Sequence, residues 1–182
     1  ARTVANKGAR ALLLNRKSER SKSSYHQLKK ENPGANIVNI ECDLQSFDSV
    51  RKAALRVIDL CQDGLDSLCN NAGIMALKDE ATVDGFDVQM QTNHLSHFLL
   101  TKEFLPLLKT AAELRGDARV VNHSSIARYG DKKLKTKYFD KRGGDLGGDG
   151  SNMILASLTR KGRWARYSQT KLANATFTAC LH

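Results

Sequence analysis

Four short apolar segments, separated by longer polar stretches, constrain the fold of this chain more than any other feature. They lie within "ALLLN" (11–15), "ANIVNIECD" (35–43), "LDSLCNNAG" (65–73) and "ARVVNHSS" (118–125). Their apolar residues run together instead of alternating with polar ones, which is typical of parallel strands covered on both faces. We therefore expect an α/β fold built on a doubly wound parallel sheet.

The stretches between these segments carry apolar residues at helical spacing. Helices are predicted at about residues 18–32, 46–61 and 85–114, and again from about Trp164 onwards. Ser46 is suited to cap the second of these helices, because a serine oxygen can accept a free backbone N–H of the first turn. Strands and helices therefore alternate along the whole chain, as a parallel sheet requires.

Polar residues follow each predicted strand. Asn15 and Arg16 come after the first, Asp43 after the second, residues 70–73 after the third, and residues 124–125 close the fourth. Turns after strands favour such residues anyway, so one occurrence alone means little. Because parallel strands end at one edge of a sheet, and ligands bind beyond that edge, four such ends together predict a binding site.

A tyrosine and a lysine four residues apart, Tyr167 and Lys171, stand in the last predicted helix. Positions i and i+4 share one face of a helix, so both side chains can enter the same cleft. A free phenol has a pKa near ~10, and a nearby ammonium favours the phenolate. Tyr167 is therefore a candidate general acid or base, although an isolated pair of this kind is more often a solvated helix face.

Four segments together resemble the short-chain dehydrogenase/reductase family, and the wording of two of them is similar to its retinol-dehydrogenase-like branch. They are "NNAG" (70–73), "TNHLSHFLLT" (92–101), "VVNHSS" (120–125) and "YSQTKLAN" (167–174). The resemblance implies a Rossmann-like fold and an oxidoreductase that moves a hydride between a nicotinamide cofactor and a carbonyl or alcohol. It covers nearly the whole chain, and the order of the four segments makes it specific.

The resemblance also assigns roles to individual residues. Tyr167 is the implied proton donor and acceptor, and Lys171 is implied to hold the nicotinamide ribose as well. Ser125 is implied to bind the substrate oxygen, with Ser124 as the alternative. Asn93 matches the helical asparagine that holds a water molecule beside the lysine, and a simple core hydrogen bond is its alternative reading.

The choice of cofactor depends on the end of the first strand. An acidic residue there would bind a ribose 2′-hydroxyl and repel a 2′-phosphate. Asn15 is neutral instead and is followed by Arg16 and Lys17, which favours NADP over NAD, because arginine can bind phosphate in bidentate fashion. A generic basic turn is the alternative. The resemblance places further residues beside the cofactor, namely Asp43, Leu44, Asn71, Ala72 and Gly73.

The family's pattern extends beyond both ends of this sequence. The opening residues resemble the first helix and second strand of the fold, and the sequence ends soon after Tyr167. We therefore expect a fragment, incomplete at both ends and inactive by itself, in which the strands at Ala11 and Leu65 each lack a neighbour. It forms one partial domain, 1–182, with a long Gly- and Lys-rich insertion at 126–162 near the substrate mouth.

The net charge of +10 raises a different function class, a nucleic-acid or anionic-surface binder. Much of that charge lies in residues 131–142, but the segment lacks interleaved aromatic residues and any known binding motif. A solvated basic loop explains it better, so we expect a small-molecule substrate and no nucleic acid. A non-catalytic fragment is the remaining alternative.

No metal site is expected, because the histidines at positions 94, 97 and 123 lack ligand-like partners. The four cysteines form no CxxC pair, and those at positions 42, 69 and 180 lie in apolar runs that predict burial, as in a reduced intracellular protein. No apolar run approaches the roughly 20 residues that span a bilayer. We expect a cytoplasmic protein, without support for membrane association and with helices available for an oligomer.

Overall fold

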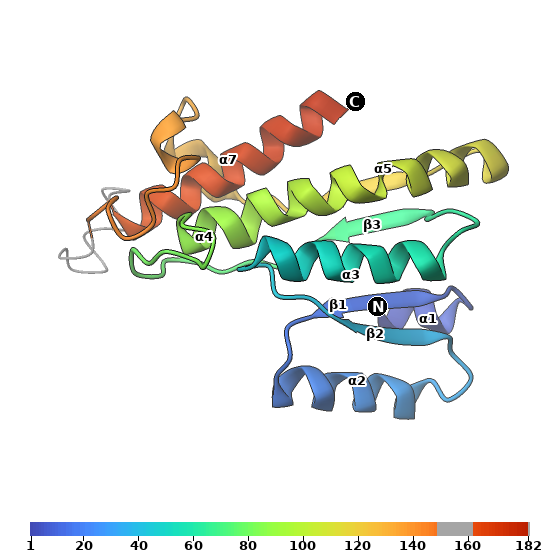
Figure 1. Ribbon diagram of the computed structural model, residues 1–182. Coiled ribbons are helices and arrows are strands. Elements are labelled where there is room, and N and C mark those ends of the chain that lie inside the picture. The colour runs from blue at the N-terminus through green and yellow to red at the C-terminus, as the bar shows by residue number, and fades with distance from the viewer. Residues whose placement is uncertain (149–161, 182) are drawn as a thin grey trace.

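The computed structural model describes residues 1–148 and 162–181, and these residues form the α/β arrangement that the sequence predicts (Figure 1). In chain order its elements are α1 (Arg2–Asn6), β1 (Ala11–Asn15), α2 (Glu19–Glu31), β2 (Ile37–Glu41), α3 (Phe47–Leu60), β3 (Ser67–Asn70), α4 (Val88–Met90), the π-helical turn η1 (Gln91–Leu95), α5 (Ser96–Arg115), β4 (Arg119–Asn122), the 3-10 turns η2 (Ile126–Gly130) and η3 (Thr136–Tyr138), and α7 (Arg163–Leu181).

One predicted helix start, that of α3, is confirmed by its capping residue. The Ser46 hydroxyl oxygen accepts a hydrogen bond from the backbone N–H of Ser49 and so caps α3, as expected. The long helix differs from its prediction at the start. It begins at Val88 instead of Gly85, because the Asp87 carboxylate caps it, and its next turn, η1, is π-helical. A π-helical turn closes i→i+5 hydrogen bonds in place of i→i+4, and the helix predicted over 85–114 did not include such a turn.

The strands pair in parallel, but in two separate two-stranded sheets instead of one continuous sheet. In the first, β1 lies beside β2, with Ala11 opposite Ile37. In the second, β3 lies beside β4, with Ser67 opposite Arg119. Within the described residues, each of the four strands therefore has one unpaired edge. The arrowheads of β1 and β3 in Figure 1 point to the same side of the molecule.

Both faces of the first sheet are covered, as its continuous apolar run predicts. Leu12 and Leu14 pack against the main core, which α3 and α5 share with the strands. Leu13 and Ile37 pack on the other side, against Leu28 of α2. The main core is centred on fully buried side chains of α3 and α5, among them Val50, Val57 and Phe104.

The segment after β4 is attached to the body of the protein as far as it is described. The carboxylate of Asp79 accepts backbone N–H groups of Gly144, Leu146 and Gly147 at 2.9, 2.6 and 2.5 Å. Gly143 lies against the 81–86 turn so closely that an added Cβ would be 2.5 Å from the Phe86 carbonyl oxygen. Residues 149–161, the rest of the predicted insertion, lie outside the described residues.

Burial of the cysteines is only partly as predicted. Cys42 is buried, but Cys69 and Cys180 are exposed, and all of them are free thiols. Cys69 lies on the face of β3 opposite to Leu68, which faces the core, and Cys180 lies near the exposed end of α7. The prediction was wrong for these two residues because an apolar run does not reveal which face of its strand or helix stays uncovered.

Candidate active site

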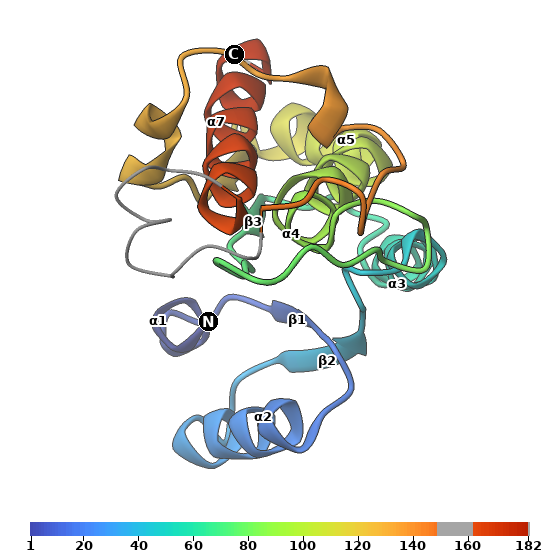
Figure 2. The ribbon, with the colours of Figure 1, turned by 90° about the vertical axis from the view of Figure 1, so that its left-hand side faces the viewer.

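The motif segments converge on one side of the second sheet, at the end of β3. Seen from that side, β3 points toward the viewer between α7, α5 and α4 (Figure 2). A pocket of about 190 Å³ lies here, and its lining joins the residues after β3 to His123 after β4 and to α7. Its lining residues are Asn71, Gly73, Ile74, Met75, His123, Tyr167 and Lys171.

The Lys171 side chain is buried in this pocket, with only 4% of the residue exposed. Its Nζ donates a hydrogen bond to the His123 carbonyl oxygen at 3.0 Å. Burial lowers the pKa of the Lys171 ammonium below its ordinary value, because a low-dielectric environment disfavours the charged form. The pocket therefore holds a cation with few protein partners, and such a group attracts polar or anionic ligand atoms.

Tyr167 lies on the same face of α7, as the spacing of the pair predicts. The Lys171 Nζ is 5.7 Å from the centre of the Tyr167 ring, and Trp164 contacts that ring edge-on, with 6.1 Å between ring centres. The tyrosine is half-buried and lines the pocket. A phenol and an ammonium therefore share one small cavity, and this arrangement can transfer a proton to or from a bound oxygen.

Asn93 is fully buried beside the pocket, in the π-helical turn η1. Its side-chain oxygen accepts the backbone N–H of Ile74 at 2.8 Å. Its side-chain nitrogen donates to the Ile74 carbonyl at 2.8 Å and to the Thr170 hydroxyl at 3.0 Å. The amide thus fastens the segment after β3 to α7, so its position is fixed by three hydrogen bonds.

Gly73 has no side chain, and the side chains of Asn93 and Lys171 lie against it. A Cβ added there would lie 3.4 Å from Asn93 Oδ1 and 3.6 Å from Lys171 Nζ. A larger side chain would therefore crowd both groups and close part of the pocket. This is a physical reason for a glycine after the Asn70-Asn71-Ala72 turn, beyond the ease with which glycine turns the chain.

The two serines at the end of β4 have different partners. The Ser124 hydroxyl donates to the carbonyl oxygen of Lys171 at 2.8 Å. The Ser125 oxygen accepts the backbone N–H of Ala127 at 3.2 Å and so caps η2. Neither serine belongs to the lining of the 190 Å³ pocket. A serine hydroxyl can accept and donate at once, and within the described residues the Ser125 hydroxyl makes no hydrogen bond as donor, so its hydrogen is available to a ligand.

The predicted cofactor residues of the first sheet lie outside this pocket, at the ends of β1 and β2. The Asn15 amide donates to the Asn39 side chain at 2.9 Å, and Arg16 and Lys17 are exposed. The Asp43 carboxylate accepts the backbone N–H of Gln45 at 2.9 Å. The Leu44 carbonyl accepts the Ser96 hydroxyl at 2.6 Å, which ties this strand end to the start of α5.

Of the remaining predicted residues, Asn71 belongs to the pocket, whereas Ala72 is not part of its lining. Sequence reasoning missed Ile74, whose backbone binds the Asn93 amide, and His123, whose carbonyl binds Lys171. It also missed Asn174, whose amide nitrogen donates to the same carbonyl at 3.1 Å. Asn174 stands in the quoted "YSQTKLAN" segment, three positions after Lys171, and this position was the available signal.

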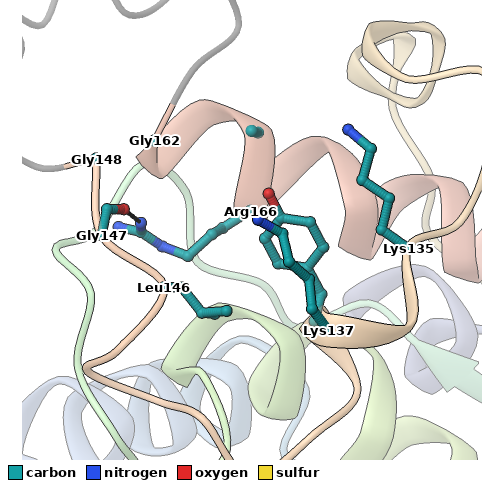
Figure 3. A pocket seen from close by; sticks show the side chains of 9 residues that line it. Lys135, Lys137, Leu146, Gly147, Gly148, Gly162 and Arg166 are labelled. Atoms are coloured by element: carbon teal, nitrogen blue, oxygen red, sulfur yellow. Dashed lines mark hydrogen bonds between the residues drawn. The ribbon is translucent and has the colours of Figure 1, made fainter.

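A larger pocket of about 250 Å³ lies at the start of α7, between Lys135, Lys137 and the Gly147-Gly148 backbone (Figure 3). The Arg166 guanidinium in its wall points toward Gly147, donates to the carbonyls of Gly147 and Leu77, and pairs with Asp87 at 3.3 Å. Burial raises the pKa of the Asp87 carboxyl to about 6. These contacts hold α7 against α4, so we regard the cluster as structural.

Comparisons with known proteins agree with this arrangement. A family model described as "short chain dehydrogenase" matches residues 1–138. The uncharacterized oxidoreductase C736.13 of Schizosaccharomyces pombe is 38% identical over 180 residues, which cover 98% of this chain and 49% of that protein. Human retinol dehydrogenase 13 is 31% identical over 175 residues, which cover 96% of this chain and 46% of that protein. The chain therefore spans about half the length of these curated relatives.

A solved structure extends the comparison to three dimensions. The NADPH-bound carbonyl reductase from chicken fatty liver superimposes with a TM-score of 0.62 and is 26% identical. The match covers 93% of this chain and 60% of that one. Within the described residues of the present chain, no helix is long and apolar enough to cross a membrane.

Proposed function

The chain belongs to the short-chain dehydrogenase family and is similar to its retinol dehydrogenases, and on this premise we propose that the intact protein transfers a hydride between NADP(H) and a carbonyl or alcohol substrate. The observation that carries the proposal is the Tyr167–Lys171 pair at the 190 Å³ pocket, with the lysine ammonium buried. Family membership supports an oxidoreductase, and this pair supports a general acid and base within it.

The residues present are suited to a nicotinamide dinucleotide. Gly73 leaves the backbone after β3 open to close approach, and the buried Lys171 ammonium is a donor for ribose hydroxyls. Exposed Arg16 and Lys17 at the end of β1 provide positive charge for a 2′-phosphate. We place Asp43, Leu44, Asn71 and Ala72 along the same ligand. When bound, the nicotinamide supplies or accepts the hydride.

Residues of the chain itself transfer the proton to and from the substrate oxygen. Tyr167 donates its phenolic hydrogen to the substrate oxygen in reduction and takes it back in oxidation. Lys171 favours the phenolate by its charge. Ser125 donates its hydroxyl hydrogen to the same substrate oxygen and stabilises the charge that develops there. Asn93 holds the segment after β3 and α7 in place through its three side-chain bonds.

The substrate we propose is a lipophilic aldehyde or a retinoid-like alcohol. The similarity to a human retinol dehydrogenase supports this class. The apolar side chains of Ile74 and Met75 in the pocket lining are compatible with it. The direct test is an NADPH-oxidation assay of the intact protein with a series of medium-chain aldehydes and retinal. Absence of turnover with the whole series, in a protein that binds NADPH, would refute the proposed reaction.

The two serines provide a further prediction. We expect Ser125→Ala to lower kcat by about a hundredfold, the typical effect of removing one donor to a developing oxyanion. We expect Ser124→Ala to leave kcat within about a fewfold of the wild type, because its hydroxyl is bound to the Lys171 backbone. Steady-state kinetics of both variants check this. A severe loss in Ser124→Ala alone would move the substrate contact to that residue.

Cofactor preference gives a prediction about Arg16. We expect Arg16→Asp to weaken NADPH binding by about ten- to a hundredfold and to shift preference toward NADH, since a charge-assisted bond to phosphate is worth roughly 1.5–3 kcal/mol. Fluorescence titration with both cofactors measures the ratio. Arg20→Asp is the matched control, because Arg20 is an exposed arginine in the first turn of α2, four residues after Arg16. An equal shift in both variants would indicate general surface charge instead of a phosphate contact.

A further inference from the structure

One buried carboxamide, that of Asn174, joins three segments of the candidate active site. The residue is only 3% exposed. Its side-chain nitrogen donates to two backbone carbonyl oxygens, that of Asn93 at 3.0 Å and that of His123 at 3.1 Å. Asn93 lies in η1 and His123 follows β4, while Asn174 itself is on α7. A single side chain therefore fixes the spacing between these three elements.

The orientation of this amide is set by His94. The Asn174 side-chain oxygen lies 3.0 Å from His94 Nδ1. Because both hydrogens of the Asn174 amide point at carbonyl oxygens, its own oxygen must be the acceptor, so His94 carries a hydrogen on Nδ1. Burial lowers the pKa of His94, which keeps the ring neutral at neutral pH. The ring thus holds the amide in the one orientation that bonds both carbonyls.

The Lys171 ammonium uses one of the same carbonyls. Lys171 Nζ and Asn174 Nδ2 both donate to the His123 carbonyl oxygen, at 3.0 and 3.1 Å. The other carbonyl, that of Asn93, accepts Asn174 Nδ2 and also His97 Nδ1 at 3.0 Å. Both side-chain donors to the Asn93 backbone carbonyl are groups other than the Lys171 ammonium. Among the described residues, the His123 carbonyl is therefore the acceptor that anchors the ammonium.

Few other titratable groups face this ammonium. His97 is buried, and its pKa is lowered to about 4, mainly by burial and partly by the charge of Lys171, so it is neutral at neutral pH. His94 contacts the Asn174 side-chain oxygen, and Tyr167 lies on the same face of α7 as Lys171. The position of the ammonium thus depends on hydrogen-bond geometry and not on an ion pair with a described carboxylate.

We propose that Asn174 is a positioning residue of the active site, which holds the His123 and Asn93 carbonyls together so that the Lys171 ammonium has one fixed place beside Tyr167 and Gly73. The expected effect of Asn174 substitutions on turnover rests on the proposed hydride-transfer function. The expected effect on the pKa of Lys171 does not, because the His123 carbonyl and the Asn174 amide both belong to the protein. The two consequences are therefore measured separately.

The test uses two variants of the intact protein and a matched pair of controls. Asn174→Leu keeps the volume and excludes water but removes both donors, whereas Asn174→Ala also opens space for water beside Lys171. Gln89→Leu and Gln89→Ala are the controls. Gln89 is fully buried and also joins the long helical segment to α7, but its amide donates to the Arg163 carbonyl at 3.1 Å and not near Lys171.

We expect Asn174→Leu to lower kcat by about 10- to 100-fold with little change in KM, because a small displacement of a catalytic group has this effect. We expect Asn174→Ala to raise the pKa of Lys171 toward its ordinary value of 10.5, since entering water relieves the burial of the ammonium. The NMR signal of the labelled lysine Cε reports that titration without cofactor. The Gln89 variants lower the melting temperature but leave both kcat and the Lys171 titration unchanged.

Two results would overturn the inference. One is a kcat of Asn174→Leu no lower than that of Gln89→Leu in an active protein. The other is a Lys171 titration in Asn174→Ala that matches the wild type. If the intact protein has no NADPH-dependent turnover, the proposed function fails, and the titration alone decides the role of Asn174. If the alanine variant does not fold, the same titration in Asn174→Leu must show a broadened or shifted Lys171 signal relative to Gln89→Leu, or the inference is wrong.

Discussion

Tyr167→Phe is expected to lower kcat of the intact protein by about three orders of magnitude or more, while NADPH affinity stays within about twofold. The variant removes the phenolic hydrogen that the proposed reaction gives to the substrate oxygen, and general acid–base catalysis contributes about 10²- to 10⁴-fold. It removes little packing volume, because the ring and its edge-on contact with Trp164 remain. Turnover with a reactive aldehyde and a separate NADPH titration measure the two effects.

Tyr129→Phe is the matched control for this substitution. Tyr129 is exposed and lies in η2, outside the pocket lining, so it should keep wild-type turnover. Near-normal turnover of Tyr167→Phe itself would mean that another group moves the proton. The assignment of Tyr167 would then be wrong, although the family membership of the chain would stand.

Lys171→Met is expected to have the second large effect, on both kcat and cofactor binding. The Lys171 Nζ lies 5.7 Å from the centre of the Tyr167 ring, so its charge supports proton transfer by this phenol, and general acid–base catalysis contributes about 10²- to 10⁴-fold. Methionine keeps the length of the side chain but provides neither charge nor donor. We therefore expect kcat to fall by up to about a thousandfold and the KM for NADPH to rise, as measured by steady-state kinetics.

The same variant has a stability signature that depends on pH. Burial lowers the pKa of Lys171 in the folded protein, so between that lowered value and the ordinary 10.5 the unfolded chain binds more protons than the folded one. The ammonium thus opposes folding at neutral pH, and this cost decreases as pH rises through the lowered pKa. Lys171→Met should therefore melt no lower than the wild type at pH 7, and its relative advantage should shrink toward pH 10.

The exposed lysine Lys109 on α5 provides the control for that comparison. Lys109→Met should change neither kcat nor the pH dependence of the melting temperature, because an exposed ammonium is hydrated in both states. If Lys171→Met destabilises the protein at pH 7 and the loss does not vary with pH, the hydrogen bond to the His123 carbonyl outweighs the burial of the charge.

The sequence by itself determined the local structure and the chemistry that it carries. Continuous apolar runs predicted β1 and β2 and the coverage of both their faces, since side-chain burial on a strand is a local pattern. Ser46 predicted the start of α3 through its own hydroxyl. The i, i+4 spacing predicted that Tyr167 and Lys171 share a face, because helix geometry alone decides it. The order of four motifs was enough to indicate the family.

Only the tertiary structure decided which of these residues touch one another. Asn93 and Thr170 are 77 positions apart, and His94 and Asn174 are 80 apart, so their contacts depend on how α7 packs against η1. The same packing gives the two serines different partners, since the Ser124 hydroxyl donates to the Lys171 backbone carbonyl and the Ser125 oxygen accepts the Ala127 N–H. The sequence places Asn174 in the YSQTKLAN segment but does not show which groups its amide binds. The role of Asn174 depends on contacts that α7 makes with η1 and with the residue after β4, and local sequence does not predict contacts between elements that are far apart in the chain.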